Sequence, residues 1–412
     1  MVNYEQFFSA AAKRGKRSEI RELLKLTRKP GIISFAGGLP APDLFPVDEI
    51  KEMAKIVMEK EGRIALQYGP TEGDNRLREE LTKMLREDGV TLSVDKMLII
   101  TSSQQGLDFV AKVFIDPGDV IITGRPTYVG AIQAFNSYGA AMHGIDLDNE
   151  GTQTAQLELE IQKLAKSGKK PKFLYEIPDF QNPSGITMSL RRRRELIKIA
   201  EKHDLLIVED SPYRQLRFEG KAEPSIISMA PERTIALYTF SKILLPGFRL
   251  GWMVAPLEVI DKAVMAKQAV DLCSPPYTQS ILFEFISRGL LQKQIEKIVA
   301  AYRHKRDFML AKLDQYMPKI EGLKWTKPAG GLFLWVTLPA YMDATEMFIS
   351  AVEKKVAYVV GTAFYPDGSG KNNFRMNFSY SSLEEIDEGI KRLAECIREF
   401  EGDKDKGSFV TP

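Results

Sequence analysis

The sequence predicts an α/β fold built on a largely parallel sheet. From about Lys96 onward, short apolar runs alternate with longer amphipathic segments, which is the pattern of strands connected by helices. The runs are apolar enough to be covered on both faces, as the strands of a parallel sheet are. The expected strands are Met97 to Ile100, Val120 to Ile122, Phe173 to Ile177, Leu205 to Val208 and Thr234 to Tyr238.

Polar residues follow every one of these strands. Because ligands of open α/β sheets bind at the carboxyl ends of the strands, the polar endings together predict one ligand site at that edge. The endings are Thr101 to Gln104, Thr123 to Tyr128, Pro178 to Pro183, Glu209 to Tyr213 and Thr239 to Lys242.

The pattern of the chain changes after about Leu290. A long helical stretch is followed by strand-like runs at Gly331 to Val336 and Asn373 to Tyr380, which indicates a second domain of α+β type. A chain of 412 residues is also long enough for two domains. We therefore expect an N-terminal arm and loop over residues 1–50, a large domain over 51–290 and a small domain over 291–412.

The composition argues against several classes of partner. The 57 basic and 55 acidic residues nearly cancel, so the net charge gives no long-range attraction to nucleic acid or to a membrane surface. No apolar stretch approaches the roughly 20 residues needed to span a bilayer. The two cysteines cannot form a disulfide framework and fit a reducing compartment, so we expect a cytoplasmic protein. The three histidines lie far apart, without the spacing of a metal site.

Four consecutive arginines, Arg191 to Arg194, need an explanation. They follow Ser189, a good helix N-cap, and lead into an apolar-periodic stretch from Leu196 to Ala200. We expect a solvated helix face, and a nucleic-acid site is the less favoured alternative.

Lys242 stands directly after an apolar strand, where a charge gains nothing unless a partner or a chemical task holds it. Asp210 ends the preceding strand. A reactive amine and a buried carboxylate are what pyridoxal 5′-phosphate (PLP) requires, for a Schiff base and for a protonated ring nitrogen. Its phosphate needs a helix N-terminus, hydroxyl groups and a cation, which Ser103, Gln104, Ser241 and Arg249 would supply. The alternatives are a surface lysine and an aspartate that caps a turn.

Three motifs give the chain a family resemblance. They are Ser241-Lys242 followed by Pro246 to Gly251, Asn182-Pro183-Ser184-Gly185, and Asp210-Ser211-Pro212-Tyr213. In this order they resemble the fold-type I PLP-dependent aminotransferases, over about Ser18 to Arg392. The resemblance implies a large domain with a mostly parallel seven-stranded sheet and a smaller α+β domain.

Within that superfamily the chain looks most like the 2-aminoadipate, kynurenine and broad-specificity aromatic aminotransferases. The matching segments are Ser18 to Leu24, Phe35 to Pro40 and Ser103 to Leu107. The resemblance implies that Tyr128 stacks on the cofactor ring and that Asn182 and Tyr213 hydrogen-bond its phenolic oxygen. It also implies a homodimer, in which Tyr68 reaches the phosphate bound by the partner subunit.

The resemblance also suggests substrate-binding residues. Arg375 lies in a run whose alternation places Phe374 and Met376 on one face and Arg375 on the opposite, polar face. It matches the family's clamp for the substrate α-carboxylate, with Asn182 and Gly38 nearby; the alternative is a structural, salt-bridged arginine. Arg21 matches the arginine that approaches the distal carboxylate of 2-aminoadipate, unless it is an exposed arginine paired with a glutamate.

The expected activity is transfer of an amino group from an L-amino acid to a 2-oxo acid. The donors would be 2-aminoadipate, glutamate, aromatic or aliphatic amino acids, and the acceptor 2-oxoglutarate. Lys242, Asp210 and Tyr213 would be the catalytic residues, with Lys242 carrying the proton from the substrate α-carbon. Two rivals keep the cofactor: a PLP-dependent lyase on the same fold, and a PLP-sensing transcription regulator, which would need a helix-turn-helix before the resemblance begins near Ser18.

Overall fold

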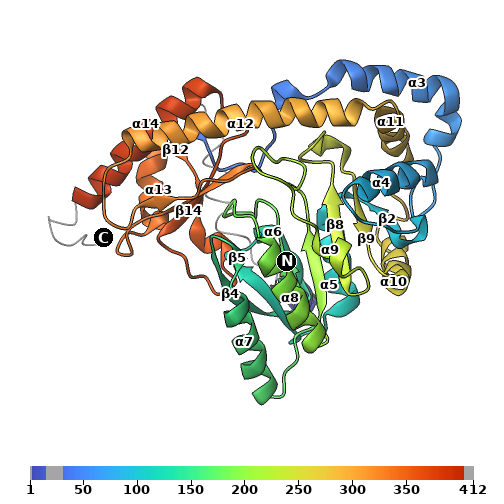
Figure 1. Ribbon diagram of the computed structural model, residues 1–412, viewed down its shortest axis with the longest axis horizontal. Helices are drawn as coiled ribbons and strands as arrows, with labels where there is room; N and C mark the ends of the chain where they lie inside the picture. The colour runs from blue at the N-terminus through green and yellow to red at the C-terminus, as the bar shows by residue number, and fades with distance from the viewer. Residues whose placement is uncertain (1, 15–30, 403–412) are drawn as a thin grey trace.

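The computed structural model describes residues 2–14 and 31–402, and Arg21 lies outside these ranges. A large sheet with its helices lies beside a smaller group of C-terminal elements, and the long helix α12 (Leu290–Tyr316) runs along both of them (Figure 1). The other described helices are α1 (Ala10–Arg14), α3 (Val47–Ala65), α4 (Asn75–Glu87), α5 (Ser102–Phe114), α6 (Val129–Ser137), α7 (Thr154–Lys166), α8 (Leu190–Lys202), α9 (Ile226–Met229), α10 (Leu257–Gln268), α11 (Pro276–Ser287), α13 (Ala344–Glu353) and α14 (Leu383–Gly402).

The large sheet has the strand order β2-β9-β8-β7-β6-β3-β4-β5. Neighbouring strands from β8 through to β4 are parallel, whereas β9 and β5 run antiparallel to their neighbours. Its strands are β2 (Met97–Ile100), β3 (Val120–Arg125), β4 (Ala141–Asp148), β5 (Gly151–Thr152), β6 (Phe173–Glu176), β7 (Leu206–Asp210), β8 (Thr234–Thr239) and β9 (Gly251–Val254). The mixed α/β class predicted from the sequence is therefore confirmed, and the two-residue strand β5 brings the sheet to eight strands rather than seven.

Helices cover both faces of the large sheet because successive side chains of each strand point to opposite sides. On one face, Val120, Ile122 and Ile207 pack with residues of α7, α8 and α9. On the other, Ile121 and Val208 pack with residues of α5, α6 and α10. This two-sided burial explains why the central strands are continuously apolar in sequence.

The smaller group is built on an antiparallel sheet of order β10-β11-β14-β13. Its strands are β10 (Lys324–Trp325), β11 (Phe333–Thr337), β13 (Val359–Val360) and β14 (Asn373–Asn377). The N-terminal segment joins this group, since β1 (Ile33–Ser34) pairs in parallel with β12 (Val356–Ala357). Farther along, Tyr302 Oη accepts a hydrogen bond from Ala41 N at 2.9 Å. These contacts are consistent with the division at residues 50 and 290, which we retain as a proposal.

Among the strands longer than two residues, β4 and β9 were not expected from the sequence. Strand β4 carries His143, Asp146 and Asp148 and is mostly half-buried, so it lacks a continuous apolar run. Strand β9 begins at Gly251, within a motif interpreted for its chemistry rather than its backbone. Sequence patterns recognise the fully covered strands and miss those at a sheet margin or beside a loop motif.

The arginine run on α8 is the clearest departure from expectation. Ser189 caps the helix as predicted, accepting a hydrogen bond from Arg192 N at 3.3 Å. However, Arg192 and Arg193 are buried, and Arg193 is 0% exposed. The expectation of a solvated face is therefore wrong for half of the run. Each of the two buried guanidinium groups has a carboxylate partner, which offsets the cost of removing its charge from water.

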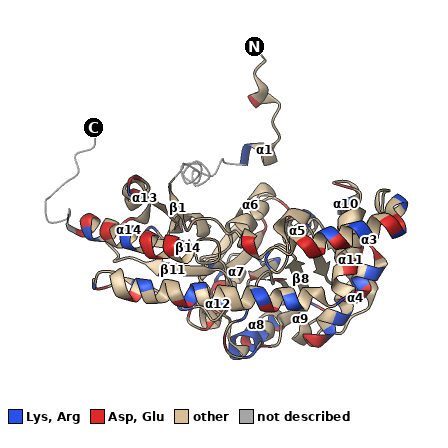
Figure 2. Cartoon of the chain, turned by 90° about the horizontal axis from the view of Figure 1, so that it is seen from above, with Lys and Arg blue, Asp and Glu red and all other residues tan. Residues whose placement is uncertain are grey.

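Surface charge is mixed where the exposed helices are seen. Figure 2 shows acidic and basic residues interleaved along α3, α12 and α14. Within the described residues, no helix is both long and apolar enough to cross a bilayer. The cytoplasmic location stays a prediction.

Candidate active site

The carboxyl ends of β3, β6, β7 and β8 form the edge where the candidate residues lie. The chain passes from β3 outward to β4, and then returns to build β6, β7 and β8 on the other side of β3. The loops after β3 and β6 therefore turn away from each other, which opens a crevice at this point of the sheet. The predicted convergence of polar strand endings is observed in contacts between the loops after β6 and β7 and between those after β2 and β8.

Lys242 lies just after β8, where its side chain reaches the N-terminal segment. Its Nζ donates a hydrogen bond to Gly38 O at 2.8 Å. Burial, together with the nearby Arg375 and Arg249, lowers the pKa of Lys242 to about 8. A much larger fraction of this amine is therefore neutral near pH 7 than of an exposed lysine, as a nucleophile or base requires.

Asp210 ends β7 and is 2% exposed. Its Oδ2 accepts a hydrogen bond from Tyr175 Oη at 2.8 Å, while its buried Oδ1 has no hydrogen-bond partner among the described residues. Burial raises the pKa of Asp210 to about 7, against the effect of the Tyr175 hydrogen bond. One oxygen is thus available for a cationic N–H donor. Tyr175 was missed by sequence reasoning, and the one signal was a hydroxyl beside Glu176 at the carboxyl end of this strand.

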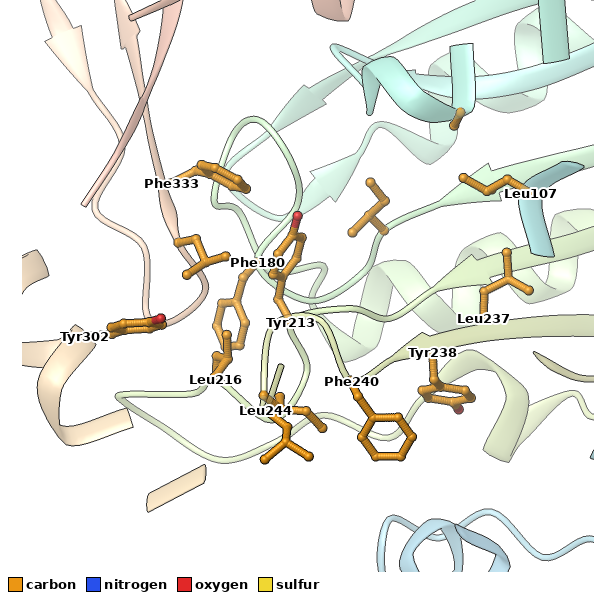
Figure 3. Close-up of a cluster of buried hydrophobic side chains, with 14 of the residues drawn as sticks. Leu107, Phe180, Tyr213, Leu216, Leu237, Tyr238, Phe240, Leu244, Tyr302 and Phe333 are labelled. Atoms are coloured by element: carbon orange, nitrogen blue, oxygen red, sulfur yellow. The ribbon is translucent and has the colours of Figure 1, made fainter. Parts of the chain in front are cut away.

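Asn182 and Tyr213 come from the loops after β6 and β7. Asn182 Nδ2 donates to Tyr213 Oη at 3.2 Å, and both residues are buried. The Tyr213 ring meets Phe333 of β11 edge-to-face at 5.7 Å between centroids. Figure 3 shows Tyr213 close to Phe180 and Phe333 within a cluster of buried hydrophobic side chains. Burial raises the pKa of the Tyr213 phenol, which favours its neutral, hydrogen-bond-donating form.

Arg375 projects from β14 toward the same place. It donates to Asn182 Oδ1 and to Ala36 O, each at 2.8 Å. Its guanidinium lies over the Phe333 ring at 4.1 Å and over the Phe364 ring at 5.0 Å. Arg375 lies on the opposite side of β14 from Phe374, as predicted, and its surroundings combine neutral polar acceptors with aromatic rings. Burial lowers its pKa to about 10.

The first turn of α5 lies next to the loop that carries Lys242. The N-cap residue Thr101 makes no side-chain capping bond, so the first N–H groups of this helix can serve an anion. Ser102 Oγ is 3.4 Å from Ser241 Oγ, and Arg249 Nη1 donates to Ser241 Oγ at 3.5 Å. Ser103 lies in this turn, and a Cβ on Gly251 would come within 3.0 Å of Ser103 N. The glycine therefore permits a close approach of helix and strand.

Tyr128 stands at the N-terminus of α6, on the other side of the crevice. Its Oη donates to Gln104 Oε1 at 3.3 Å, and Gln104 Nε2 donates to Gly130 O at 3.0 Å. Gln104 therefore acts here as a support for the Tyr128 ring. Burial raises the pKa of Tyr128.

Two predicted residues are not brought to this edge by the described chain. Tyr68 is 78% exposed, and its backbone N–H is bonded only to its neighbour Gln67. Arg21 lies outside the described residues. Residues that sequence reasoning missed are Tyr175, Phe333 and Phe364, whose roles depend on side chains far away in sequence.

The family model for aminotransferases of class I and II matches residues 32–393. The chain belongs to this family. An aromatic-amino-acid aminotransferase from Thermococcus litoralis is 48% identical over 97% of this chain and 95% of its own.

Two solved aminotransferases show the same fold. A kynurenine aminotransferase from Pyrococcus horikoshii, in complex with PMP, is 45% identical, with a TM-score of 0.93 over 96% of this chain and 98% of that one. An α-aminoadipate aminotransferase from Thermus thermophilus, complexed with N-(5′-phosphopyridoxyl)-L-leucine, is 37% identical, with a TM-score of 0.88 over 97% of this chain and 100% of that one.

The protein is thus a PLP-dependent aminotransferase. The described residues fit this cofactor, because Asp210 Oδ1 is buried without a partner among them, Lys242 is a partly buried amine with a lowered pKa, and the first turn of α5 is uncapped by a side chain. Bound PLP supplies an aldehyde for amines and a ring that accepts electrons from the substrate carbon.

Proposed function

We propose that the residues at the strand ends divide the work of transamination as follows. Asp210 Oδ1 holds a proton on the ring nitrogen, and Tyr175 fixes the orientation of its carboxylate. Asn182 and Tyr213 donate hydrogen bonds to the phenolic oxygen, and Tyr128 covers the ring. The phosphate of the cofactor is bound by Ser103, Gln104, Ser241 and Arg249. Lys242 Nζ, held beside Gly38 O, takes the proton from the substrate α-carbon.

The observation that best supports an amino-acid substrate is the state of Arg375. Arg375 is 6% exposed, and among the described residues the hydrogen-bond acceptors of its guanidinium are neutral oxygens, with no carboxylate paired to it. A buried cation without a counterion is costly, and a carboxylate with two oxygens matches its planar fork. We assign Arg375, with Asn182 and the Gly38 segment, to the α-carboxylate of the substrate.

We infer which substrate side chains the enzyme accepts from the activities that the names of the similar enzymes give. These act, by name, on aromatic amino acids, kynurenine and α-aminoadipate. The rings of Phe333 and Phe364 beside Arg375 favour a substrate that brings apolar surface next to its carboxylate. We propose aromatic and aliphatic amino acids, 2-aminoadipate and glutamate as donors, and 2-oxoglutarate as acceptor.

An amine that lacks the α-carboxylate gives a direct test. In Arg375→Gln, loss of a charge-assisted contact worth roughly 1.5–3 kcal/mol should lower kcat/KM for phenylalanine about 10- to 150-fold. The first half-reaction with phenethylamine, which has the same ring but no carboxylate, should change little. Arg375→Lys keeps the charge but lacks the planar fork, so its kcat/KM for phenylalanine should lie between those of the parent and Arg375→Gln. An equal loss for both donors would remove the carboxylate-clamp assignment.

We also propose that the enzyme is a homodimer in which Tyr68 serves the partner's phosphate site. Tyr68 follows Ile64 and Leu66 at the end of α3, and all three side chains are largely exposed in the single chain. Apolar surface of this kind suits an interface between copies. Arg21 remains our candidate for the distal carboxylate of 2-aminoadipate.

A further inference from the structure

Asp179 is the centre of a buried ionic cluster beside the active site. Its Oδ1 accepts from Arg193 Nη2 at 2.9 Å and from Arg217 Nη2 at 3.1 Å. Its Oδ2 accepts from Arg214 Nη1 at 3.0 Å. We call these residues, Asp179, Arg193, Arg214 and Arg217, the Asp179 cluster. The carboxylate is 0% exposed, so its contacts are not the weak ion pairs of a surface.

The members of the cluster come from the two loops that carry Asn182 and Tyr213. Asp179 is three residues before Asn182 in the loop after β6, whereas Arg214 directly follows Tyr213 in the loop after β7. Arg193 belongs to α8 and also donates to Pro178 O and Met188 O, at the two ends of the first loop. The carboxylate therefore ties both loops to each other and to a helix.

The backbone next to Asp179 needs such support. Phe180 has a φ of +52°, in the left-handed region that is unfavourable for a residue with a side chain. Its ring lies under the Arg217 guanidinium at 4.7 Å, and that arginine is held by Asp179. Strained residues of this kind persist only where surrounding contacts over-determine them.

The charges around the cluster show why the carboxylate is needed. Burial alone would raise the pKa of Asp179, but the three arginines together hold it below its ordinary value. The other acidic groups near the cluster are Asp88, Glu209 and Glu223. Arg214 Nε reaches Asp88 at 3.3 Å, the Glu209 carboxylate accepts from the N–H groups of Ile226 and Ile227, and the Glu223 charge acts on Arg217. Removing Asp179 would leave three guanidinium groups facing one another without their shared partner.

We propose that Asp179 is a positioning residue, which sets the distance between Asn182 and Tyr213 by binding Arg214 and Arg217 across the two loops. This inference rests on the proposed roles of Asn182 and Tyr213 at the phenolic oxygen of the cofactor. The hydrogen bonds of the Asp179 carboxylate go to the three arginines and not to either of those side chains. Asp179 acts on the oxygen through the loops that present them.

The first test follows the absorbance of the cofactor bound at Lys242 as the pH is changed. Donors to the phenolic oxygen stabilise its ionised form, so weaker donation should make the oxygen and the lysine nitrogen hold their shared proton to higher pH. In Asp179→Asn and in Arg217→Gln, the pH at the midpoint of the absorbance change should rise by about one unit, which is a tenfold change in proton affinity. Arg217→Gln leaves two arginines neutralising Asp179, so it provides a second test if Asp179→Asn does not fold.

The control is Arg78→Met, since Arg78 is another buried arginine and donates only to the backbone oxygens of Val94 and Met97. It should lower the melting temperature without moving the midpoint. Hydrogen exchange gives a readout that does not depend on activity. Exchange should increase together in residues 179–185 and 211–217 of Asp179→Asn, and in neither segment of Arg78→Met.

A shift of the midpoint with coupled exchange supports the positioning role. An unchanged midpoint in a folded Arg217→Gln or Asp179→Asn protein would mean that Asp179 contributes only to stability. The loop after β6 would then be held by its own contacts, such as the hydrogen bond from Ser184 N to Gln181 Oε1 at 2.8 Å. If the parent enzyme showed no pH-dependent absorbance, the proposed roles of Asn182 and Tyr213 would fail instead. The two ideas are therefore separable.

Discussion

At the scale of single residues, Lys242 is the group on which the assignment depends. Lys242→Ala should keep the fold but lose the covalent attachment of PLP, and turnover should fall by at least roughly 10²- to 10⁴-fold, because both nucleophile and base are lost. Borohydride reduction followed by peptide mapping should place the cofactor on Lys242 in the parent. The control is Lys267→Met, at a lysine that is 0% exposed and paired with Asp271. Labelling of any lysine other than Lys242 would contradict the prediction.

Asp210 gives a prediction about stability and pH. Its pKa is 3.8 in an ordinary setting and about 7 in the folded protein, so the unfolded chain releases this proton first as the pH rises. In the cofactor-free protein, its contribution to the free energy of unfolding should therefore fall between about pH 4 and pH 7, by on the order of 4 kcal/mol. Asp210→Asn should abolish that fall and be more stable than the parent at pH 7.5.

Denaturant unfolding of both proteins, with and without PLP, checks this prediction. With the cofactor bound, the order should reverse, since only the carboxylate pairs with a protonated ring nitrogen. Glu176→Gln is the control, because Glu176 is also buried, has its pKa raised to about 8, and pairs with Thr152. Glu176→Gln should change the free energy of unfolding by the same amount with and without PLP. If Asp210→Asn were still more stable than the parent with PLP bound, the pyridinium role would be contradicted.

At the scale of elements, the position of α5 determines where the phosphate can bind. Gly106 lets this helix pack closely on the sheet, because a Cβ there would come within 2.6 Å of Leu237 Cδ2 and 2.9 Å of Ile100 Cδ1. Gly106→Val should cost roughly 1–3 kcal/mol of stability through overpacking. It should also displace the first turn of α5 and weaken PLP binding about tenfold, if the displacement costs one charge-assisted contact.

Titration of the cofactor-free protein with PLP measures the effect. Gly62→Val is the matched control on α3, where a Cβ would meet only the end of the Met58 side chain at 3.7 Å. It should leave the affinity for PLP unchanged. A Gly106→Val protein that binds PLP like the parent would show that the helix position has little influence.

At the scale of the whole molecule, the exposed residues at the end of α3 predict the assembly. A two-fold interface uses each residue twice, so loss of roughly 1.5–3 kcal/mol per buried leucine should raise the dimer dissociation constant at least roughly 100-fold in Leu66→Asp. Leu159→Asp is the control, since Leu159 on α7 is 65% exposed and Leu66 is 66% exposed. Sedimentation equilibrium checks both proteins. Equal behaviour of the two variants would place the interface elsewhere.

The same variants test whether Tyr68 serves the partner. Once Leu66→Asp dissociates, PLP should be lost more readily, because a donor to the phosphate leaves with the partner subunit. Tyr68→Phe should weaken PLP binding without dissociation. A dimer of Tyr68→Phe that holds PLP as tightly as the parent would limit Tyr68 to packing.

The sequence by itself determined the fold class and indicated the candidate reactive residues. Strands buried on both faces must be apolar, so β2, β3, β6, β7 and β8 were visible as runs, and their polar ends indicated Lys242 and Asp210. The half-buried strand β4 gave no such run. Chemistry that depends on residue type and position after a strand can be predicted locally, and the family resemblance adds the expected partners.

Only the tertiary structure decided which side chains support those residues. The orientation of Asp210 depends on Tyr175, which is 35 positions away, and Arg375 is enclosed by Phe333 and Phe364 from separate segments. Helical periodicity predicted a solvated Arg193, yet this residue is buried because Asp179, 14 positions away, neutralises it. Burial of a charge depends on whether a partner meets it in space, and that pairing is not encoded in any local pattern.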